Sequence, residues 1–153
     1  MKLSKEQLER FDRDGYLFFP SLFTKEEIRV LTDEVPGLYS QRRAENVREK
    51  TGDVVRTAFA VHTYHPVFEA LIHHPRFVEP AEQLLGDRTY IHQFKINGKA
   101  AFDGDVWQWH EASATWKADD DMPEARAMNL AVFIDEVNEF NGPLWFIPRS
   151  HKK

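Results

Sequence analysis

The stretch Thr89-Tyr-Ile-His-Gln-Phe-Lys-Ile-Asn97 marks the point at which the character of the sequence changes. It is rich in β-branched and aromatic residues, and it runs into Asn97-Gly98, a pair that is typical of tight turns between strands. Further runs of this kind are Val106–His110, Ala127–Ile134 and Leu144–Ile147, separated by turn signals at Asp103-Gly104 and Asn141-Gly142-Pro143. We therefore predict that residues 88–153 are mainly strands.

Residues 1–86 carry helix signals instead. Two capping boxes, Ser4 with Gln7 and Thr24 with Glu27, predict helix starts, because each side chain can satisfy the other's backbone N–H group. The second of these helices is expected to end at Pro36-Gly37. Two further short helices are expected at Pro66–His74 and Pro75–Leu85, since proline is favoured at the first position of a helix.

Strands are also expected within this first part, at Tyr16–Phe19 and Val54–His62, with a mobile loop over residues 40–53. Helices followed by antiparallel-looking strands predict an α+β fold with a jelly-roll-like sheet. A jelly roll needs about eight strands, and the residues after 88 supply roughly half of them. We expect one domain, residues 1–153, with a sheet that is incomplete at its C-terminus and edges that favour self-association.

Composition excludes several classes of function. Among the 153 residues 42% are hydrophobic, which is enough for a packed core, and the formal charge of −5 argues against a nucleic-acid partner. The absence of cysteine excludes disulfides and thiolate metal sites. No apolar run reaches the length of a membrane span, and the N-terminus is polar from Lys2 onward. A cytoplasmic enzyme or binding protein without a membrane partner is expected.

The segment with the clearest chemical character is Asp-Val-Trp-Gln-Trp-His-Glu-Ala-Ser-Ala-Thr-Trp, residues 105–116. On a strand, alternate side chains share a face, so His110 and the residue two positions later can bind one metal ion. An iron(II) oxygenase site uses two histidines and one carboxylate in this way. Here the second position is Ala112, whose methyl group cannot bind a metal.

The motifs in this part of the chain resemble those of the phytanoyl-CoA dioxygenase family, closest to its ectoine-hydroxylase-like branch. The resemblance spans nearly the whole chain and is most specific over residues 93–151. It rests on Gln93-Phe-Lys-Ile-Asn97, Phe102-Asp-Gly-Asp105, Trp107-Gln-Trp-His110, Thr115-Trp116, Asp120-Asp-Met-Pro123, Arg126-Ala-Met-Asn129, Asn141-Gly-Pro-Leu144 and Ile147-Pro-Arg-Ser-His-Lys152.

The resemblance implies iron(II), 2-oxoglutarate and dioxygen as reactants, a double-stranded β-helix, and hydroxylation of a small-molecule or acyl substrate. His110 then matches the first histidine of the family's His-x-Asp pair. Gln93 and Asn97 match polar residues that line the pocket for co-substrate and substrate, and Trp116 matches an aromatic wall of that pocket.

The chain departs from the family pattern in three places. Ala112 stands where the family has the metal-binding Asp, and Arg149 stands where it usually has Gly. The second metal-binding His and the Arg that pairs with 2-oxoglutarate are expected beyond residue 153, so this chain has neither. His151 belongs to the closing turn and is not the missing ligand. We therefore expect the chain to be inactive alone.

Other polar residues have structural interpretations. Glu111 is expected on the face opposite His110, where it reaches a metal only across a bulge. Solvated or helix-capping roles are expected for His62, His65 and His73-His74, and a solvated loop for Asp119–Asp121. Lys95 either meets an acidic co-substrate or lies at the edge of the sheet.

Three functions are open at this point. The first is an oxygenase, including a halogenase-like variant in which a halide takes the place of the carboxylate at Ala112 if a C-terminal half exists. The second is a non-catalytic binding module on the same scaffold. The third is a truncated product without function.

Overall fold

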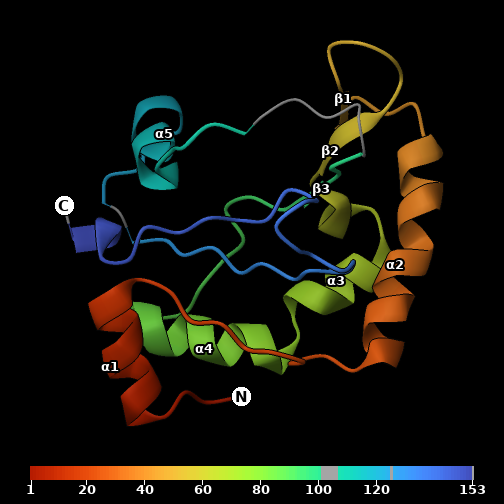
Figure 1. The fold of residues 1–153 in the computed structure, drawn as a ribbon. Coiled ribbons are helices and arrows are strands. Elements are labelled where there is room, and N and C mark those ends of the chain that lie inside the picture. The colour runs from red at the N-terminus through yellow and green to blue at the C-terminus, as the bar shows by residue number, and fades with distance from the viewer. Residues whose placement is uncertain (101–106, 125, 153) are drawn as a thin grey trace.

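The computed structural model describes residues 1–100, 107–124 and 126–152 (Figure 1). Its helices are α1 (Lys5–Asp14), α2 (Lys25–Ser40), α3 (Pro66–Ile72), α4 (Pro75–Leu85) and α5 (Ala112–Asp119), with short 3-10 turns η1 (Val61–Thr63) and η2 (Ser150–Lys152). Its strands are β1 (Asn46–Arg48), β2 (Val55–Phe59) and β3 (Lys95–Asn97). In Figure 1, α1 and α4 lie together on one side of the molecule and α2 lies on the other. The predicted combination of helices with antiparallel strands is confirmed.

Both capping boxes form as the sequence predicts. In the first, the hydroxyl of Ser4 accepts from the Gln7 amide at 3.2 Å, and the Gln7 side chain accepts from the Ser4 amide at 2.8 Å. Thr24 and Glu27 exchange the same pair of hydrogen bonds. Because the first N–H groups of a helix have no partner within the helix, these contacts fix where α1 and α2 begin.

The predicted end of α2 at Pro36-Gly37 is wrong, because the helix continues to Ser40. A proline inside a helix costs roughly 3 kcal/mol. Leu31 and Leu38 lie on either side of it and are 5% and 2% exposed, so both depend on the helix for their place in the core. Burial of these two side chains offsets the cost of the proline.

The sheet has the order β1-β2-β3, and both pairings are antiparallel. β1 lies within residues 40–53, which were expected to form a loop, and Val47 pairs with Thr57 of β2. Asn46 explains why this segment forms a strand instead of a loop, because its buried side-chain amide donates to the carbonyls of Leu38 and Gln41 at 2.8 and 3.0 Å. Asn46 thus satisfies carbonyl groups at the end of α2 and is also the first residue of β1.

The core lies between α2, the sheet and α3. Its buried members are Leu31, Leu38, Ala58, Val61 and Phe68. Side chains from the last third of the chain, including Val132 and Ile134, pack against this cluster. Residues far apart in the sequence therefore share one core.

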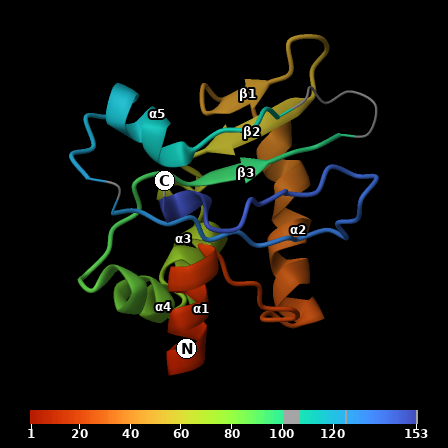
Figure 2. The same ribbon diagram turned by 60° about the vertical axis from the view of Figure 1, so that its left-hand side comes forward.

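The strands predicted after β3 are largely absent from the described residues. Only Lys95–Asn97 of the run 89–97 is a strand, and the runs 127–134 and 144–147 are irregular, as are residues 107–110 and Tyr16–Phe19. Val106 and the turn at 103–104 lie outside the described residues. A strand needs a neighbouring strand to pair with, and the pairings in the described residues join only β1, β2 and β3. The segment 126–147 crosses the molecule as an irregular chain (Figures 1 and 2).

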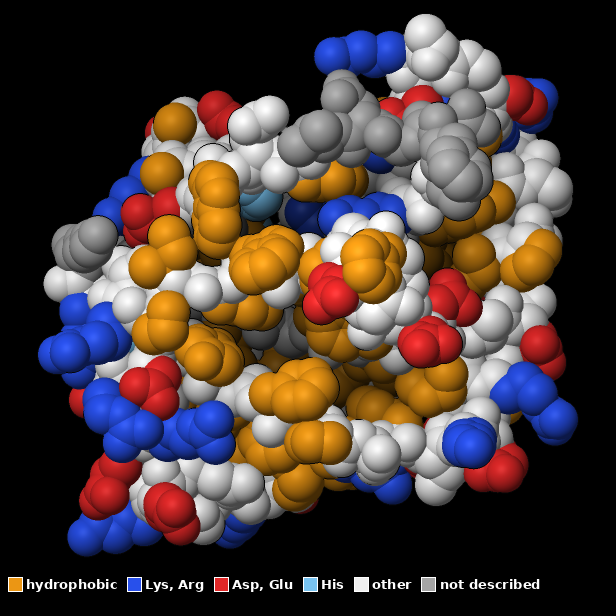
Figure 3. Space-filling model, viewed as in Figure 1, with side chains coloured by type: hydrophobic (Ala, Val, Ile, Leu, Met, Phe, Trp, Pro, Cys, Tyr) orange, Lys and Arg blue, Asp and Glu red, His pale blue; other side chains and the backbone are white. Residues whose placement is uncertain are grey.

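This segment leaves an apolar face uncovered. Leu144, Trp145, Phe146 and Ile147 are all more than half exposed. Figure 3 shows hydrophobic side chains gathered over this face. A hollow of about 360 Å³ lies among Phe18, Phe133, Val137, Pro143 and Leu144. Within the part of the chain that the structure describes, no helix is long and apolar enough to cross a membrane.

Candidate functional site

His110 lies in the irregular segment that leads into α5, and its side chain is exposed. Its Nδ1 atom is 2.8 Å from the carbonyl oxygen of Gln108. Because a carbonyl only accepts hydrogen bonds, this contact requires a proton on Nδ1, and in the neutral ring the lone pair then lies on Nε2. In its neutral form, the ring with this contact has the tautomer that a metal-binding histidine with a backbone partner adopts.

The expected strand through His110 is wrong. Ala112 is the first residue of α5, so the alternation of faces on which the pairing of residues 110 and 112 was argued does not apply. The sequence held a signal for this helix, since Ala112, Ala114 and Ala118 fall within eight residues and alanine has the highest helix propensity. The expectation that His110 binds a metal therefore rests on the sequence motif around it and on the contact of its Nδ1 atom.

Trp107, at the start of this segment, lies over an arginine of the sheet. The guanidinium carbon of Arg56 is 4.1 Å from the centre of the Trp107 ring, a cation–π contact. The same guanidinium reaches both carboxylate oxygens of Glu49, at 3.1 and 3.3 Å. The side chain of Glu49 is only 5% exposed, so its charge requires this partner.

Trp116, expected to wall a pocket, lies on α5 against His92. The two rings meet edge to face with their centres 5.4 Å apart. The Nε2 atom of His92 is 3.0 Å from Oδ2 of Asp120, at the end of the same helix. Asp120 was expected in a solvated loop, and its contact with His92 was not predicted. His92 and Asp120 are 28 positions apart in the sequence, and no spacing signal predicts their contact.

Gln93 and Asn97 are both exposed as whole residues. Asn97 ends β3, and its side-chain oxygen accepts from the Thr57 hydroxyl at 3.0 Å. No hydrogen bond joins either residue to His110 in the described parts of the chain.

The side chains in the described ranges do not fit an iron site by themselves. An oxygenase iron requires three protein ligands around one point. No group of three His, Asp or Glu residues that could hold a metal ion is found among residues 1–100, 107–124 and 126–152. His110 supplies one imidazole nitrogen, and a single neutral ligand gives weak and unselective binding.

The remaining histidines have structural surroundings. His62 packs beside Phe94 with ring centres 5.2 Å apart, and burial lowers its pKa. His65 lies 3.4 Å from the Glu34 carboxylate. His74 accepts from the Arg76 amide at 3.1 Å and so caps the start of α4, whereas His73 ends α3. The expected capping role at a helix C-terminus therefore applies to His73 alone.

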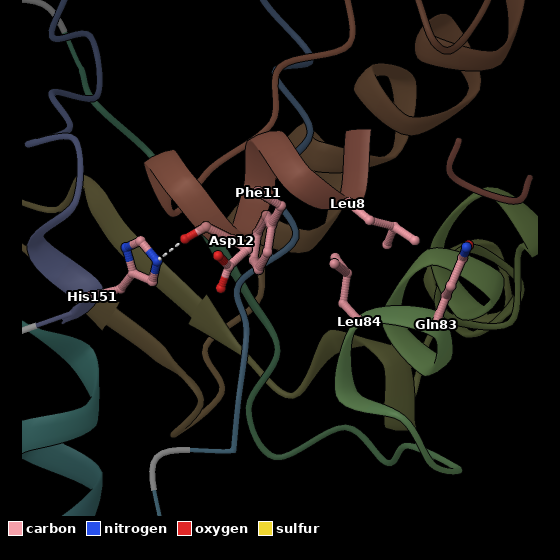
Figure 4. Close-up of a pocket in the computed structure, with 6 residues that line it drawn as sticks. All are labelled: Leu8, Phe11, Asp12, Gln83, Leu84 and His151. Carbon is pink, nitrogen blue, oxygen red and sulfur yellow. Dashed lines mark hydrogen bonds between the residues drawn. The ribbon is translucent and has the colours of Figure 1, made fainter. Parts of the chain in front are cut away.

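His151 lines a hollow of about 300 Å³ between α1, α4 and η2 (Figure 4). Leu8, Phe11 and Asp12 come from α1, and Gln83 and Leu84 come from α4. The Nε2 atom of His151 is 2.9 Å from the Asp12 carbonyl oxygen, the contact drawn in Figure 4. Lys152 reaches the carboxylate of the same aspartate at 3.0 Å.

Burial against the core raises the pKa of Tyr39 to about 12, and Asp135 adds to the effect. We expect one phenol of the native protein to ionise only near this pH, and Tyr39→Phe to remove that step from a titration of phenolate absorbance. The unfolded chain releases the same proton near pH 10. The preference of the folded state for the neutral Tyr39 phenol therefore stabilises the fold fully below pH 10. This stabilisation is lost as the pH rises from 10 towards 12. Tyr90→Phe, at a side chain 80% exposed, should leave the late step in place.

Comparison with known proteins identifies the class. The family model for phytanoyl-CoA dioxygenase (PhyH) matches residues 11–153. The chain is 37% identical to the ectoine dioxygenase of Bordetella bronchiseptica over 155 residues, covering 99% of this chain and 50% of that protein. It is 38% identical to the L-proline trans-4-hydroxylase of Streptomyces griseoviridis over 141 residues, covering 92% and 53%.

A similar structure is that of EctD from S. alaskensis with 2-oxoglutarate and 5-hydroxyectoine. The TM-score is 0.77 at 33% identity, covering 81% of this chain and 45% of that one. EctD from the same organism with bound Fe matches with a TM-score of 0.70 at 32% identity, covering 74% and 42%. The protein belongs to the phytanoyl-CoA dioxygenase family, and the chain spans about half the length of the curated relatives it matches.

Proposed function

We propose that this chain contributes the helical scaffold and one metal-binding histidine to a non-haem iron(II)/2-oxoglutarate dioxygenase that hydroxylates a small molecule. The reaction inserts one atom of dioxygen into a C–H bond of the substrate, and 2-oxoglutarate takes the other as it becomes succinate and carbon dioxide. Family membership and relatives named for ectoine and L-proline support this class. The likeness to EctD supports the double-stranded β-helix as the complete fold.

The observation that carries the proposal is the orientation of His110. Its Nδ1 proton is directed at the Gln108 carbonyl, and Nε2 is therefore the nitrogen that presents a lone pair. In the proposal His110 binds the metal, while Gln93, Asn97 and Trp116 line the pocket for co-substrate and substrate. The contacts of Asn97 with Thr57 and of Trp116 with His92 support the latter role by fixing both side chains.

Ala112 favours a second candidate, a binding module that has kept the scaffold without the chemistry. A methyl group at the position of the family's aspartate, together with the missing three-ligand group among the described residues, supports it. A halide in place of the carboxylate is the third candidate. In an anaerobic titration with iron(II), a visible charge-transfer band that appears only with 2-oxoglutarate would favour the first candidate over the second, because only a chelated co-substrate gives this band.

We expect the chain alone to release no succinate above the background of free iron, because one imidazole cannot hold the metal in a geometry that leaves positions for co-substrate and oxygen. Ala112→Asp should strengthen the binding of manganese(II), measured from the broadening of the His110 ring signals in NMR. Ala112 is the first residue of α5 and stands two positions from His110, so a carboxylate there adds a second donor at short range along the chain. Ala118→Asp, which adds the same charge later in α5, is the matched control.

Two results would contradict these two expectations. Succinate release that disappears in His110→Ala would show that the chain turns over alone. Equal manganese affinity in Ala112→Asp and Ala118→Asp would show that residues 110 and 112 do not converge on one metal.

A further inference from the structure

The segment that carries His110 is attached to the sheet side of the molecule at both of its ends. Trp107 lies on Arg56 of β2 at one end. Trp116 and Asp120 contact His92, three residues before β3, at the other. In Figures 1 and 2, α5 stands on the far side of the sheet from α2.

The first attachment is rigid because of Glu49. Its carboxylate is nearly inaccessible to water and both of its oxygens face the Arg56 guanidinium. A buried carboxylate without a cation is costly, so the guanidinium stays in this position. The flat face of the guanidinium then provides a fixed platform for the Trp107 ring.

The second attachment combines two contacts from one side chain. His92 meets the Trp116 ring with its edge and approaches the Asp120 carboxylate with Nε2. The side chain of His92 is 28% exposed, so water competes only partly for these contacts. Trp116 and Asp120 lie one helical turn apart, and the contact therefore holds the last turn of α5.

We propose that Arg56 and His92 are positioning residues that hold residues 107–120 so that His110 keeps its proton on Nδ1 and its lone pair on Nε2. The inference rests on the proposed metal-binding role of His110. The bond from Nδ1 to the Gln108 carbonyl is exposed and spans two residues. It persists only while the backbone on both sides stays in place, because water can replace the carbonyl as soon as the segment moves.

The test is the tautomer of His110, read from the ¹⁵N shifts of its ring in the labelled chain at about pH 8, where an ordinary imidazole is neutral. A spectrum of His110→Ala identifies the signal. We expect the Nδ1–H form to predominate in the wild type. In Arg56→Gln and in His92→Ala the ratio of Nδ1–H to Nε2–H should fall by roughly threefold to tenfold, the value of one exposed hydrogen bond.

Matched variants separate positioning from general loss of structure. Arg43→Gln removes an arginine that lies over Tyr64 at 3.9 Å, away from this segment, and should leave the tautomer unchanged. Arg56→Lys keeps a charge beside Glu49 without the flat platform and should fall between wild type and Arg56→Gln. If Arg56→Gln unfolds the protein, His92→Ala tests the proposal from the other end. An unchanged tautomer in folded Arg56→Gln and His92→Ala would overturn it.

The outcome is distinguishable from failure of the proposed function. Manganese(II) that leaves the His110 signals sharp, while the tautomer responds to both variants, would refute metal binding and keep the positioning role. Broadening of the His110 signals, together with a tautomer ratio that neither variant changes, would support metal binding and refute the positioning role.

Discussion

Phe68→Ala should lower the free energy of unfolding by about 3–5 kcal/mol, measured by urea denaturation. Phe68 is 3% exposed, at the centre of the cluster that joins α2, β2 and α3. Its ring also meets Phe94 edge to face, with centres 6.0 Å apart. Removal of the ring takes away this contact and leaves a cavity that neighbours on three elements cannot fill together.

Phe140→Ala is the matched control, since the same change is made at a side chain that is 89% exposed. Its effect should stay within about 0.5 kcal/mol. Phe68→Leu, which keeps most of the volume, provides a milder variant if Phe68→Ala does not fold. Equal urea midpoints for Phe68→Ala and Phe140→Ala would contradict the assignment of Phe68 to the core.

Gly15→Ala should lower stability by more than the roughly 1–2 kcal/mol that a left-handed conformation costs an alanine. Gly15 ends α1 with φ of +85°, and a Cβ atom there would lie 2.3 Å from Nδ1 of His151. Since no side chain tolerates that distance, the His151 ring must move and give up its hydrogen bond to Asp12.

Gly86→Ala isolates the two causes. Gly86 ends α4 in the same left-handed conformation, with φ of +74°, but a Cβ atom there meets nothing within 4 Å. The difference in thermal stability between the two variants measures the displacement of His151. It should shrink when both are made in a His151→Ala background, and a difference that persists there would contradict the packing seen in Figure 4.

Local signals predicted the helices well. The capping boxes at Ser4 and Thr24 and the proline starts at Pro66 and Pro75 involve groups within a few residues of one another, which the sequence displays directly. The same kind of signal misled at Pro36, where long-range burial of Leu38 decided the outcome. The prediction of strands after β3 was wrong for a related reason. A strand depends on neighbouring strands, and a single run of sequence does not contain them.

The candidate site was only partly predictable. The motif around His110 indicates the residue and the family, because those depend on residue identity alone. The strand geometry assumed for Ala112 did not hold, since the alanine-rich stretch that follows forms a helix. Arg56 and His92 escaped prediction altogether, as their contacts with Trp107 and Asp120 join segments distant in sequence.

The contact between η2 and α1 also orders events in time. α1 has no buried residue, and a helix of 10 residues is marginal in water without tertiary contacts. In its last turn, the Asp14 carbonyl accepts a hydrogen bond from the Arg149 amide, and the Asp12 carbonyl accepts one from the His151 ring. Both donors belong to residues that are synthesised long afterwards. α1 is therefore completed only after these later residues have been made, and a nascent chain halted before Arg149 should show α1 more open to proteases than the α2–α3 core.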